Sequence, residues 1–312
     1  MKKNFYLLAL AATMLGCGDG EGDGQSLALT ADNTAVVLVD MQPDFTQLTS
    51  RPKPNLAVKG ADKAFVNSVK AFLSFCNKKK IPMIATQDWH PEEKDGKGHI
   101  SLASAHGKKA FQGKEEGGIL EFILHNGNGE VFTKSGLKSF GKEVEDLITY
   151  ESFKEAAEAA EAKQNLGLVV QALWPDHCVQ GTEDAELVEE IAPFVSYDNR
   201  VKKGQHRHLE SYSGFYEGFI AEGDKRNKPS ELNNKLKALK GGKIENIVVI
   251  GLALDYCVNA TAQDGVDFSY NVYLLPELSR GVGPKTTQLR LEEMKKKGVK
   301  KLSLEELKKQ IK

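Results

Sequence analysis

Cysteine is scarce in this chain, and an excess of either charge is absent. The four cysteines, Cys17, Cys76, Cys178 and Cys257, form no C-x-x-C pair, which argues against a disulfide framework and against a thiolate zinc site. The 42 basic and 43 acidic residues leave a net charge of -1. This balance predicts no nucleic-acid partner and no polybasic membrane-binding face.

The N-terminus has an apolar run, but it is too short to cross a membrane. After Lys2 and Lys3, residues 5–15 are apolar over about eleven positions, whereas a transmembrane helix needs about 20. A basic start, a short apolar core and small residues at the end are typical of a secretory signal. We place that signal peptide at residues 1–16.

The signal ends in the sequence Met-Leu-Gly before Cys17, which resembles a bacterial lipobox. Cleavage in that motif precedes a cysteine that becomes lipid-modified, so we expect Cys17 to carry a lipid. Residues 17–30, rich in glycine and acidic side chains, predict a flexible tether. We therefore expect a cell-envelope protein, anchored in the membrane only by this lipid and facing the periplasm or the exterior. The alternative is a cleaved signal with an incidental cysteine, which would give a secreted or periplasmic protein.

Apolar runs and helical spacings alternate along the rest of the chain. The run at residues 35–39 predicts a strand buried on both faces of a parallel sheet, and further runs predict strands at residues 81–86, 166–173, 194–197, 247–250 and 271–275. Apolar residues at three- and four-residue spacing predict helices at residues 64–76, 183–191, 230–239, 256–268 and 285–297. The alternation predicts an α/β protein, a three-layer α/β/α domain over residues 31–312 with a mainly parallel sheet.

One polar segment interrupts this alternation. Residues 101–164 are rich in glycine and lysine and contain one helical stretch, at residues 151–162. We interpret the segment as an insertion that forms either a small subdomain or a long cover over the site.

Ionisable residues follow several predicted strands at their carboxyl ends, where open α/β sheets bind ligands. Asp40 directly follows the first strand, and taken alone it fits a helix N-cap or a turn equally well. Asp88 and His90 stand two residues apart at the next strand end, so both project to the same side, as a metal site requires. His177, at another strand end, is a third candidate ligand, and His99 follows nine residues after His90.

A cysteine and a lysine pair provide candidates for nucleophilic chemistry. Cys257 follows a strand and a tight loop, at the predicted start of a helix. A helix N-terminus lowers the pKa of a thiol, and its free N–H groups can stabilise an oxyanion. The alternative is an inert buried cysteine. Lys202 and Lys203 precede Gly204 and could support a thiolate, although either lysine alone also fits the surface.

Together these segments resemble the nicotinamidase branch of the isochorismatase-like cysteine hydrolases. The motifs, in family order, are VDMQPDF, TQDWHP, LWPDHCVQGT, a Lys-Gly pair and GLALDYCVNAT. They cover most of residues 34–300 apart from the insertion. The resemblance implies the isochorismatase-like hydrolase fold, with Asp40 as the base, Lys203 as the supporting cation and Cys257 as the nucleophile.

The resemblance also implies a metal site. Asp88, His90 and His177 would bind one divalent ion, and His99 matches an extra histidine found in some members. One carboxylate and two or three imidazoles suit zinc first, with iron or manganese as alternatives.

Further residues implied by the resemblance surround the substrate. The backbone amides of Ala253 and Cys257 would form the oxyanion hole, in a loop that resembles the family's cis-peptide loop. Phe45, Trp174 and Tyr212 match the aromatic walls around the pyridine ring of the substrate.

The implied activity is hydrolysis of nicotinamide to nicotinate and ammonia through a cysteine thioester, with pyrazinamide as a further substrate. One alternative is a related cysteine amidase acting on another carboxamide or on a ureido substrate. Another is a non-catalytic, ligand-binding envelope lipoprotein. Two features depart from the family: the insertion, and an envelope signal on an enzyme of nicotinamide salvage, which is generally cytoplasmic. The sequence does not determine the oligomeric state.

Overall fold

The computed structural model describes residues 29–48, 56–92, 98–107, 121–220 and 223–311 of the chain. The predicted signal peptide, Cys17 and nearly all of the tether lie outside these residues. Among the described residues, none of the helices is both long and apolar enough to span a membrane.

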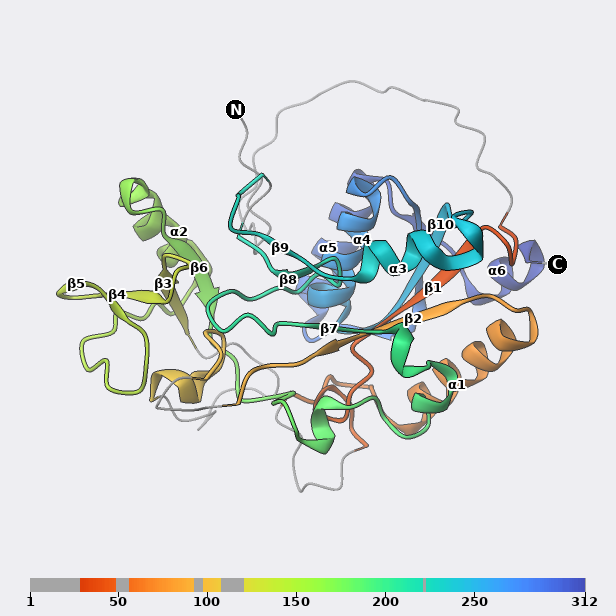
Figure 1. The fold of residues 1–312 in the computed structure, drawn as a ribbon, viewed down its shortest axis with the longest axis horizontal. Coiled ribbons are helices and arrows are strands. Elements are labelled where there is room, and N and C mark those ends of the chain that lie inside the picture. The colour runs from red at the N-terminus through yellow and green to blue at the C-terminus, as the bar shows by residue number, and fades with distance from the viewer. Residues whose placement is uncertain (1–28, 49–55, 93–97, 108–120, 221–222, 312) are drawn as a thin grey trace.

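A six-stranded parallel sheet forms the body of the protein (Figure 1). The chain runs outward from a central strand, β1, to one edge of the sheet and later returns to its other side. The carboxyl end of β1 is therefore the topological switch point at which such sheets bind ligands. In spatial order the strands are β12 (Lys300–Lys301), β11 (Asn271–Arg280), β10 (Asn246–Leu252), β1 (Thr34–Val39), β2 (Met83–Asp88) and β7 (Arg200–Lys203).

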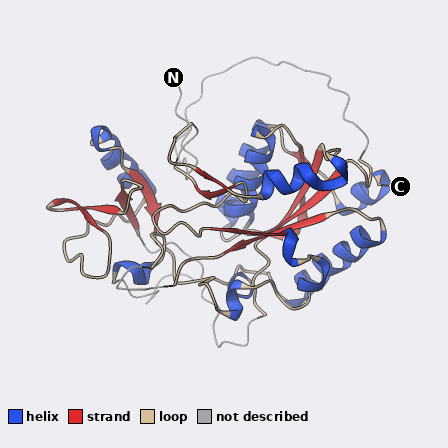
Figure 2. Ribbon diagram, in the orientation of Figure 1, coloured by secondary structure: helices blue, strands red, loops and turns tan. Residues whose placement is uncertain are grey.

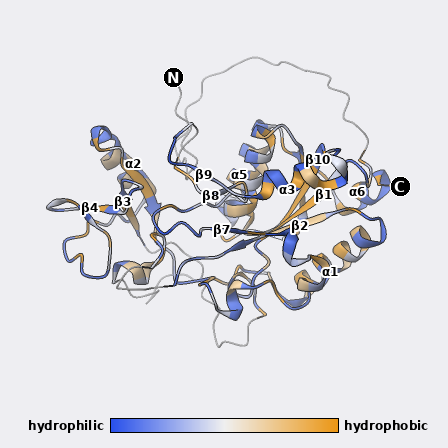
Figure 3. Ribbon diagram, viewed as in Figure 1, coloured by the Kyte–Doolittle hydropathy of each residue, from blue (hydrophilic) through white to orange (hydrophobic). Residues whose placement is uncertain are grey.

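Helices cover both faces of this sheet (Figure 2). Every residue of β1 is buried, and its side chains alternate between two apolar clusters: Val36 and Leu38 pack with α1, whereas Val37 packs with α3 and α4. Figure 3 shows β1 and β10 as hydrophobic strands between the helical layers. The predicted three-layer α/β/α fold is thereby confirmed. The helices are α1 (Lys63–Lys78) and α6 (Leu304–Gln310) on one face, and α3 (Leu232–Ala238), α4 (Asn259–Asp267) and α5 (Pro284–Lys297) on the other.

A second, antiparallel sheet lies to one side of the body (Figure 1). Helix α2 (Phe153–Glu161) packs on it, with the rings of Phe122 and Phe153 6.1 Å apart. A short hairpin of β8 (Tyr216–Gly218) and β9 (Lys228–Pro229) completes the strands of the described residues. In spatial order the second sheet contains β5 (Gly136–Ser139), β4 (Glu130–Thr133), β3 (Phe122–His125) and β6 (Val169–Ala172).

Three predictions of local structure are wrong. The strand predicted at residues 166–173 exists as β6, but it pairs antiparallel with β3 in the second sheet and not in the main one. The helix predicted at residues 183–191 is only a 3-10 turn, Glu183–Ala185, followed by irregular chain. Its apolar residues are nevertheless buried, because tertiary packing replaces the helix: the Val188 amide donates to the Met41 carbonyl at 2.9 Å.

The third wrong prediction is the strand at residues 194–197. Two 3-10 turns, Ala192–Phe194 and Tyr197–Asn199, occupy this stretch, and the strand begins only at Arg200. Pro193 stands in the first turn of the former, where its fixed φ favours a turn over a strand pair.

A substitution at Gly251 would test how closely the backbone of β10 approaches that of β1. It has φ +120°, and a Cβ there would lie 2.1 Å from the Val39 carbonyl oxygen. We expect Gly251→Ala to lower the free energy of unfolding by at least about 4 kcal/mol, since backbone must move. Gly136, with φ +102° and open space around it, is the matched control, and Gly136→Ala should cost only about 1–2 kcal/mol. Equal losses in urea denaturation would refute the steric argument.

Candidate active site

Three ionisable side chains meet at the carboxyl edge of the main sheet. Asp40 follows β1, Lys203 ends β7, and Cys257 lies in the turn after β10. The Lys203 Nζ lies 3.1 Å from Asp40 Oδ2 and 3.4 Å from Cys257 Sγ. The side chains of Asp40 and Lys203 are fully buried, and Cys257 is 6% exposed. The structure therefore brings together a carboxylate, an ammonium and a thiol that are far apart in the sequence.

The Asp40 carboxylate is held in place by the neighbouring strand β2. Its Oδ1 accepts a hydrogen bond from Thr86 Oγ1 at 2.6 Å, and its amide donates to the Thr86 carbonyl at 3.2 Å. Asp40 also has φ +46°, in the left-handed region. This conformation turns the chain at the end of β1 and leaves Oδ2 facing Lys203.

Lys203 lies between two carboxylates. Its Nζ bonds to Asp88 Oδ1 as well as to Asp40, and it donates to the Ser211 carbonyl at 3.2 Å. Burial by itself disfavours the ammonium, but the negative charges of Asp40 and Asp88 outweigh it and raise the pKa of Lys203 well above its usual value. Lys203 therefore stays charged, and it links the site of the thiol to the site of Asp88.

The thiol of Cys257 is buried, and burial acts against the lowering of its pKa that a helix N-terminus would give. Burial raises the pKa of Cys257 well above its usual value; the Lys203 ammonium opposes this rise, and the nearby carboxylates add to it. Burial also raises the pKa of Asp40 to about 6, although Lys203 opposes the rise. Asp40 is thus a stronger base than an exposed carboxylate, and it is placed to accept the thiol proton.

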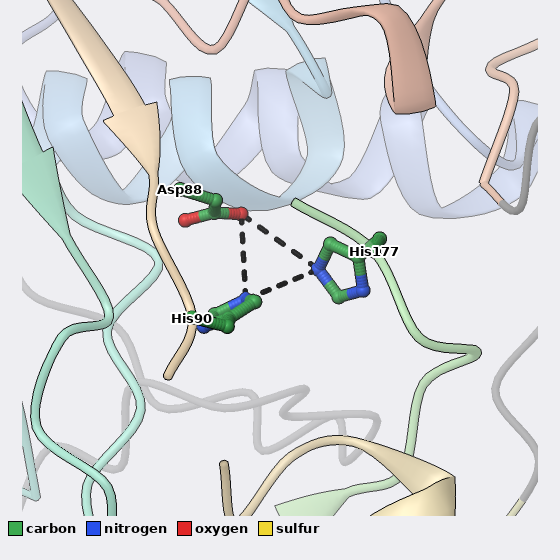
Figure 4. A group of neighbouring side chains, drawn as sticks. All are labelled: Asp88, His90 and His177. Atoms are coloured by element: carbon green, nitrogen blue, oxygen red, sulfur yellow. Dashed lines mark hydrogen bonds and ion pairs between the residues drawn. The ribbon is translucent and has the colours of Figure 1, made fainter. Parts of the chain in front are cut away.

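Asp88, His90 and His177 form a compact group of donor atoms beside the thiol (Figure 4). The His90 Nε2 lies 3.3 Å from His177 Nε2 and 4.0 Å from Asp88 Oδ2, and the third separation is 3.8 Å. Two donors bound to one zinc ion can be no more than about 4.2 Å apart, since each bond is about 2.1 Å. All three pairs meet this limit, so one ion can contact all three side chains.

Backbone carbonyls orient both imidazole rings. His90 Nδ1 lies 3.2 Å from the Gly204 carbonyl and His177 Nδ1 lies 2.7 Å from the Pro175 carbonyl. Each Nδ1 therefore carries the proton, and each Nε2 turns a lone pair toward the other, an arrangement that a cation between them stabilises. Gly204, with φ +66°, allows the close approach, because a Cβ there would lie 2.7 Å from His90 Cε1.

Glu210 is a site residue that the sequence reasoning missed. Its Oε2 lies 4.0 Å from His90 Nε2 and 3.8 Å from His99 Nδ1, and the residue is only 8% exposed. His90, His99 and Glu210 form a second compact group of donor atoms. Glu210 stands in a polar stretch without a strand or spacing pattern, so nothing in the sequence distinguished it from a surface acid.

The predicted ligand His99 has other contacts. Its Nδ1 lies 2.7 Å from Ser101 Oγ and its Nε2 3.1 Å from the Leu209 carbonyl. The ring stacks on that of His90, with centroids 4.3 Å apart. Burial lowers the pKa of both histidines to about 3, so both rings are neutral.

The charges of the site favour a bound cation. Asp40, Asp88 and Glu210 supply three buried carboxylates around the single ammonium of Lys203, and the adjacent His90 is neutral. Buried charge is costly unless it is compensated. A divalent cation at the donor group would balance this excess of negative charge.

Aromatic side chains form a wall next to Cys257. Trp174 Nε1 donates to the Tyr212 hydroxyl at 2.9 Å, and the ring of Tyr256 lies 5.1 Å from that of Trp174. Phe45 lies on the metal side, with its ring centroid 5.4 Å from that of His177. The three aromatic residues predicted from the sequence thus lie around the site, and Tyr256 is an addition to them.

The turn that carries Cys257 is fixed from both ends. The Leu252–Ala253 peptide bond is cis, and the Ala253 carbonyl accepts hydrogen bonds from the amides of Tyr256 and Val258 at 3.0 and 3.1 Å. The buried Asp255 carboxylate also accepts hydrogen bonds at the start of α5: from the amide of Gly283, the residue before the helix, at 3.0 Å, and from the Thr286 hydroxyl at 2.5 Å. The thiol therefore sits on a rigid support.

Comparison with known proteins finds relatives along most of the chain. A family model described as the isochorismatase domain matches residues 160–306. The nicotinamidase of Acinetobacter baylyi is 29% identical over 276 residues, which cover 88% of this chain and 94% of that protein.

Two solved structures share the fold. The pyrazinamidase of Pyrococcus horikoshii, in complex with zinc, is 25% identical with a TM-score of 0.52, over 87% of this chain and 99% of that one. The yeast nicotinamidase bound to the inhibitor nicotinaldehyde is 21% identical with a TM-score of 0.58, over 86% of this chain and 99% of that one.

Glu210 provides a test of the donor geometry. Glu210→Gln keeps the size of the side chain but removes a negative charge beside His90. We expect it to weaken zinc affinity about tenfold or more, as measured by competition with a chelator. Glu231→Gln, which changes a carboxylate that is 71% exposed, is the control and should bind zinc as the unaltered chain does. Equal affinities in all three proteins would show that Glu210 does not face the ion.

Proposed function

Because this chain belongs to the nicotinamidase branch of the isochorismatase-like family, we propose that it hydrolyses nicotinamide to nicotinate and ammonia. The observation that carries the proposal is the buried contact of Lys203 with both Asp40 and Cys257, directly beside the Asp88 donor group. A ligand-binding module has no need of a buried nucleophile with a base and a cation next to it.

In the first half of the proposed reaction, Cys257 becomes acylated. Asp40 takes the thiol proton, and the thiolate, stabilised by the Lys203 ammonium, attacks the carboxamide carbon. The carbonyl π-electrons move to oxygen. When the carbonyl re-forms, the carbon–nitrogen bond breaks, Asp40 returns its proton to the nitrogen, and ammonia leaves. The product of this half is a thioester between Cys257 and the pyridine carbonyl.

In the second half, water releases the product. Asp40 accepts a proton from the attacking water, the carbon–sulfur bond breaks, and the Cys257 sulfur regains a proton as nicotinate forms. One base thus serves both halves, and the Asp40 pKa of about 6 suits both directions of transfer. For the developing oxyanion we propose the backbone amides of Ala253 and Cys257, the two ends of the turn that carries the thiol.

The metal site orients the substrate in this proposal. Asp88, His90 and His177 would hold one divalent ion, with Glu210 close by. When bound, the ion supplies a Lewis acid that can anchor the ring nitrogen of the substrate. The donor set suits zinc, the ion bound to the Pyrococcus pyrazinamidase, and also iron or manganese.

The aromatic wall would hold the ring of the substrate. Phe45 approaches from the metal side, and the hydrogen-bonded pair of Trp174 and Tyr212 fixes the opposite wall. Pyrazinamide has the same carboxamide on a ring of the same size. We therefore include it as a second substrate, in line with the activity named for the Pyrococcus relative.

We also propose that the enzyme acts outside the inner membrane. The proposal rests on the signal-like residues 1–16 and on the lipobox-like residues before Cys17. In that compartment the enzyme would convert external nicotinamide to nicotinate for import.

The activity has a direct test: ammonia release from nicotinamide by the purified chain. Cys257→Ala should abolish release, because no other buried thiol lies beside Asp40 among the described residues. The variant should still bind one divalent ion, since the sulfur contributes no atom to the Asp88, His90 and His177 group. Chelation of the metal from the unaltered chain should also suppress release. Full activity in Cys257→Ala would refute the mechanism, and no release by the unaltered chain with any divalent metal would refute the substrate.

The location has its own test, in cells grown with a radiolabelled fatty acid. The chain should carry label and sediment with membranes, and Cys17→Ala should do neither. Cys76→Ala, which alters a buried cysteine in α1, is the control and should keep the label. Recovery of the unaltered protein only from the cytosolic fraction would contradict the proposal.

A further inference from the structure

The short segment that follows β1 contacts more than the catalytic base. We define the β1-end segment as residues 40–45. It contains Asp40 and, two residues later, Gln42, whose side chain has no exposed surface. The segment folds back on itself, because the Gln42 amide donates to the Asp40 carbonyl at 2.9 Å and the Phe45 amide donates to the Gln42 carbonyl at 3.1 Å. Its side chains therefore have fixed directions.

The Gln42 side chain forms hydrogen bonds with both the N–H and the C=O group of Asp88. Its Oε1 accepts a hydrogen bond from the Asp88 amide at 2.8 Å, and its Nε2 donates to the Asp88 carbonyl at 2.8 Å. The second Nε2 proton goes to the Ala185 carbonyl at 2.7 Å. A buried amide thus satisfies both peptide groups of Asp88 at the point where β2 ends, and sets the direction of its carboxylate.

Asp44 makes a similar contact with the other ligand-bearing loop. Its Oδ2 accepts a hydrogen bond from the Cys178 amide at 2.8 Å, one residue after His177. Cys178 has φ +47°, a conformation that costs free energy for a residue with a side chain. Asp44 is only 2% exposed, so this bond is shielded from water. The carboxylate therefore helps to hold the turn that presents His177.

We propose that Gln42 and Asp44 are positioning residues of the metal site, which fix Asp88 and His177 relative to each other through the β1-end segment. The inference rests on the metal site of the proposed function. Among the described residues, Asp44 belongs to none of the groups of acidic, histidine and cysteine side chains that could hold an ion, and the Gln42 amide is bonded to backbone groups. Both act on the peptide groups of ligand-bearing segments. Groups that orient the ligands of a metal in this way are commonly worth 10- to 100-fold in metal affinity.

The arrangement has a consequence for the chemistry. Asp40 lies on the same six-residue segment, so the base and the supports of two metal ligands form one rigid unit. A shift of this segment would move the base with respect to the thiol and would also loosen the donor group. Metal affinity should therefore depend on Gln42 and Asp44, which are close to the base in sequence and more than 40 positions from every proposed ligand.

The test measures metal binding by the purified full chain, without substrate. Gln42→Met keeps the length of the side chain but loses both hydrogen bonds to Asp88, and Asp44→Leu loses the bond to Cys178. We expect each to weaken zinc affinity 10- to 100-fold in chelator competition. Bound cobalt(II) should show altered visible absorption bands, because these bands report coordination geometry. Asp44→Asn, whose side-chain oxygen can still accept the Cys178 amide, should restore most of the affinity.

Gln171→Met is the matched control. Gln171 is also buried, at 4% exposed, and its side chain donates to a backbone carbonyl, that of Ala172, at 2.7 Å in the second sheet. It should lower the melting temperature but leave zinc affinity and the cobalt spectrum unchanged.

Two results would overturn the inference. One is unchanged zinc affinity in Gln42→Met and Asp44→Leu despite a lower melting temperature, which would make their role purely structural. The other is failure of the unaltered chain to bind any metal. A chain that binds zinc, loses affinity in these variants and does not release ammonia from nicotinamide would support the inference while refuting the proposed substrate.

Discussion

The buried ammonium of Lys203 is the interaction on which the site depends. It contacts Asp40, Asp88 and the Cys257 sulfur at once, and it is fully buried. The carboxylates of Asp40 and Asp88 have oxygens within 4.8 Å of each other and would repel strongly in a medium of low dielectric constant. The positive charge of Lys203 compensates this repulsion. The same charge stabilises a thiolate. The residues that we propose as catalytic base, nucleophile and metal ligand are therefore parts of one electrostatic unit.

This unit is built at the switch point of the parallel sheet. Strand β1 delivers Asp40, β2 delivers Asp88, and β7 ends in Lys203 itself. These strands are adjacent, and their carboxyl ends point the same way, so residues that are distant in sequence arrive together. The β1-end segment then ties the strands to the loop of His177. These side chains are positioned by buried hydrogen bonds and ion pairs and not by solvent-exposed contacts.

The second sheet supports the wall of the site that contains Trp174. Trp174 and His177 follow β6, which belongs to this sheet and not to the main one. The Trp174 amide donates to the Ser101 carbonyl at 2.8 Å, which connects the wall to the chain after His99. The segment interpreted as an insertion thus contributes three strands next to β6, and it helps to place the aromatic ring that we assign to substrate binding.

The sequence by itself determined the strands β1, β2, β10 and β11, the helices α1, α3, α4 and α5, and the identity of most of the residues that converge. Its apolar runs fix burial on both faces, and the polar residue directly after such a run must lie at the sheet edge. It did not determine β6, because an apolar run of that length suits a strand in either sheet, and only the partner strand decides.

Only the tertiary structure decided the rest of the site. Burial raises the pKa of the Cys257 thiol, against the effect expected from a helix N-terminus, and only the surrounding fold sets how far the thiol is buried. Glu210 carries no local pattern, and it becomes a site residue because its loop folds back beside His90. Gln42 likewise looks ordinary in sequence, and its importance comes from two hydrogen bonds to a residue 46 positions away. Interactions between distant segments depend on distances that a linear pattern does not contain.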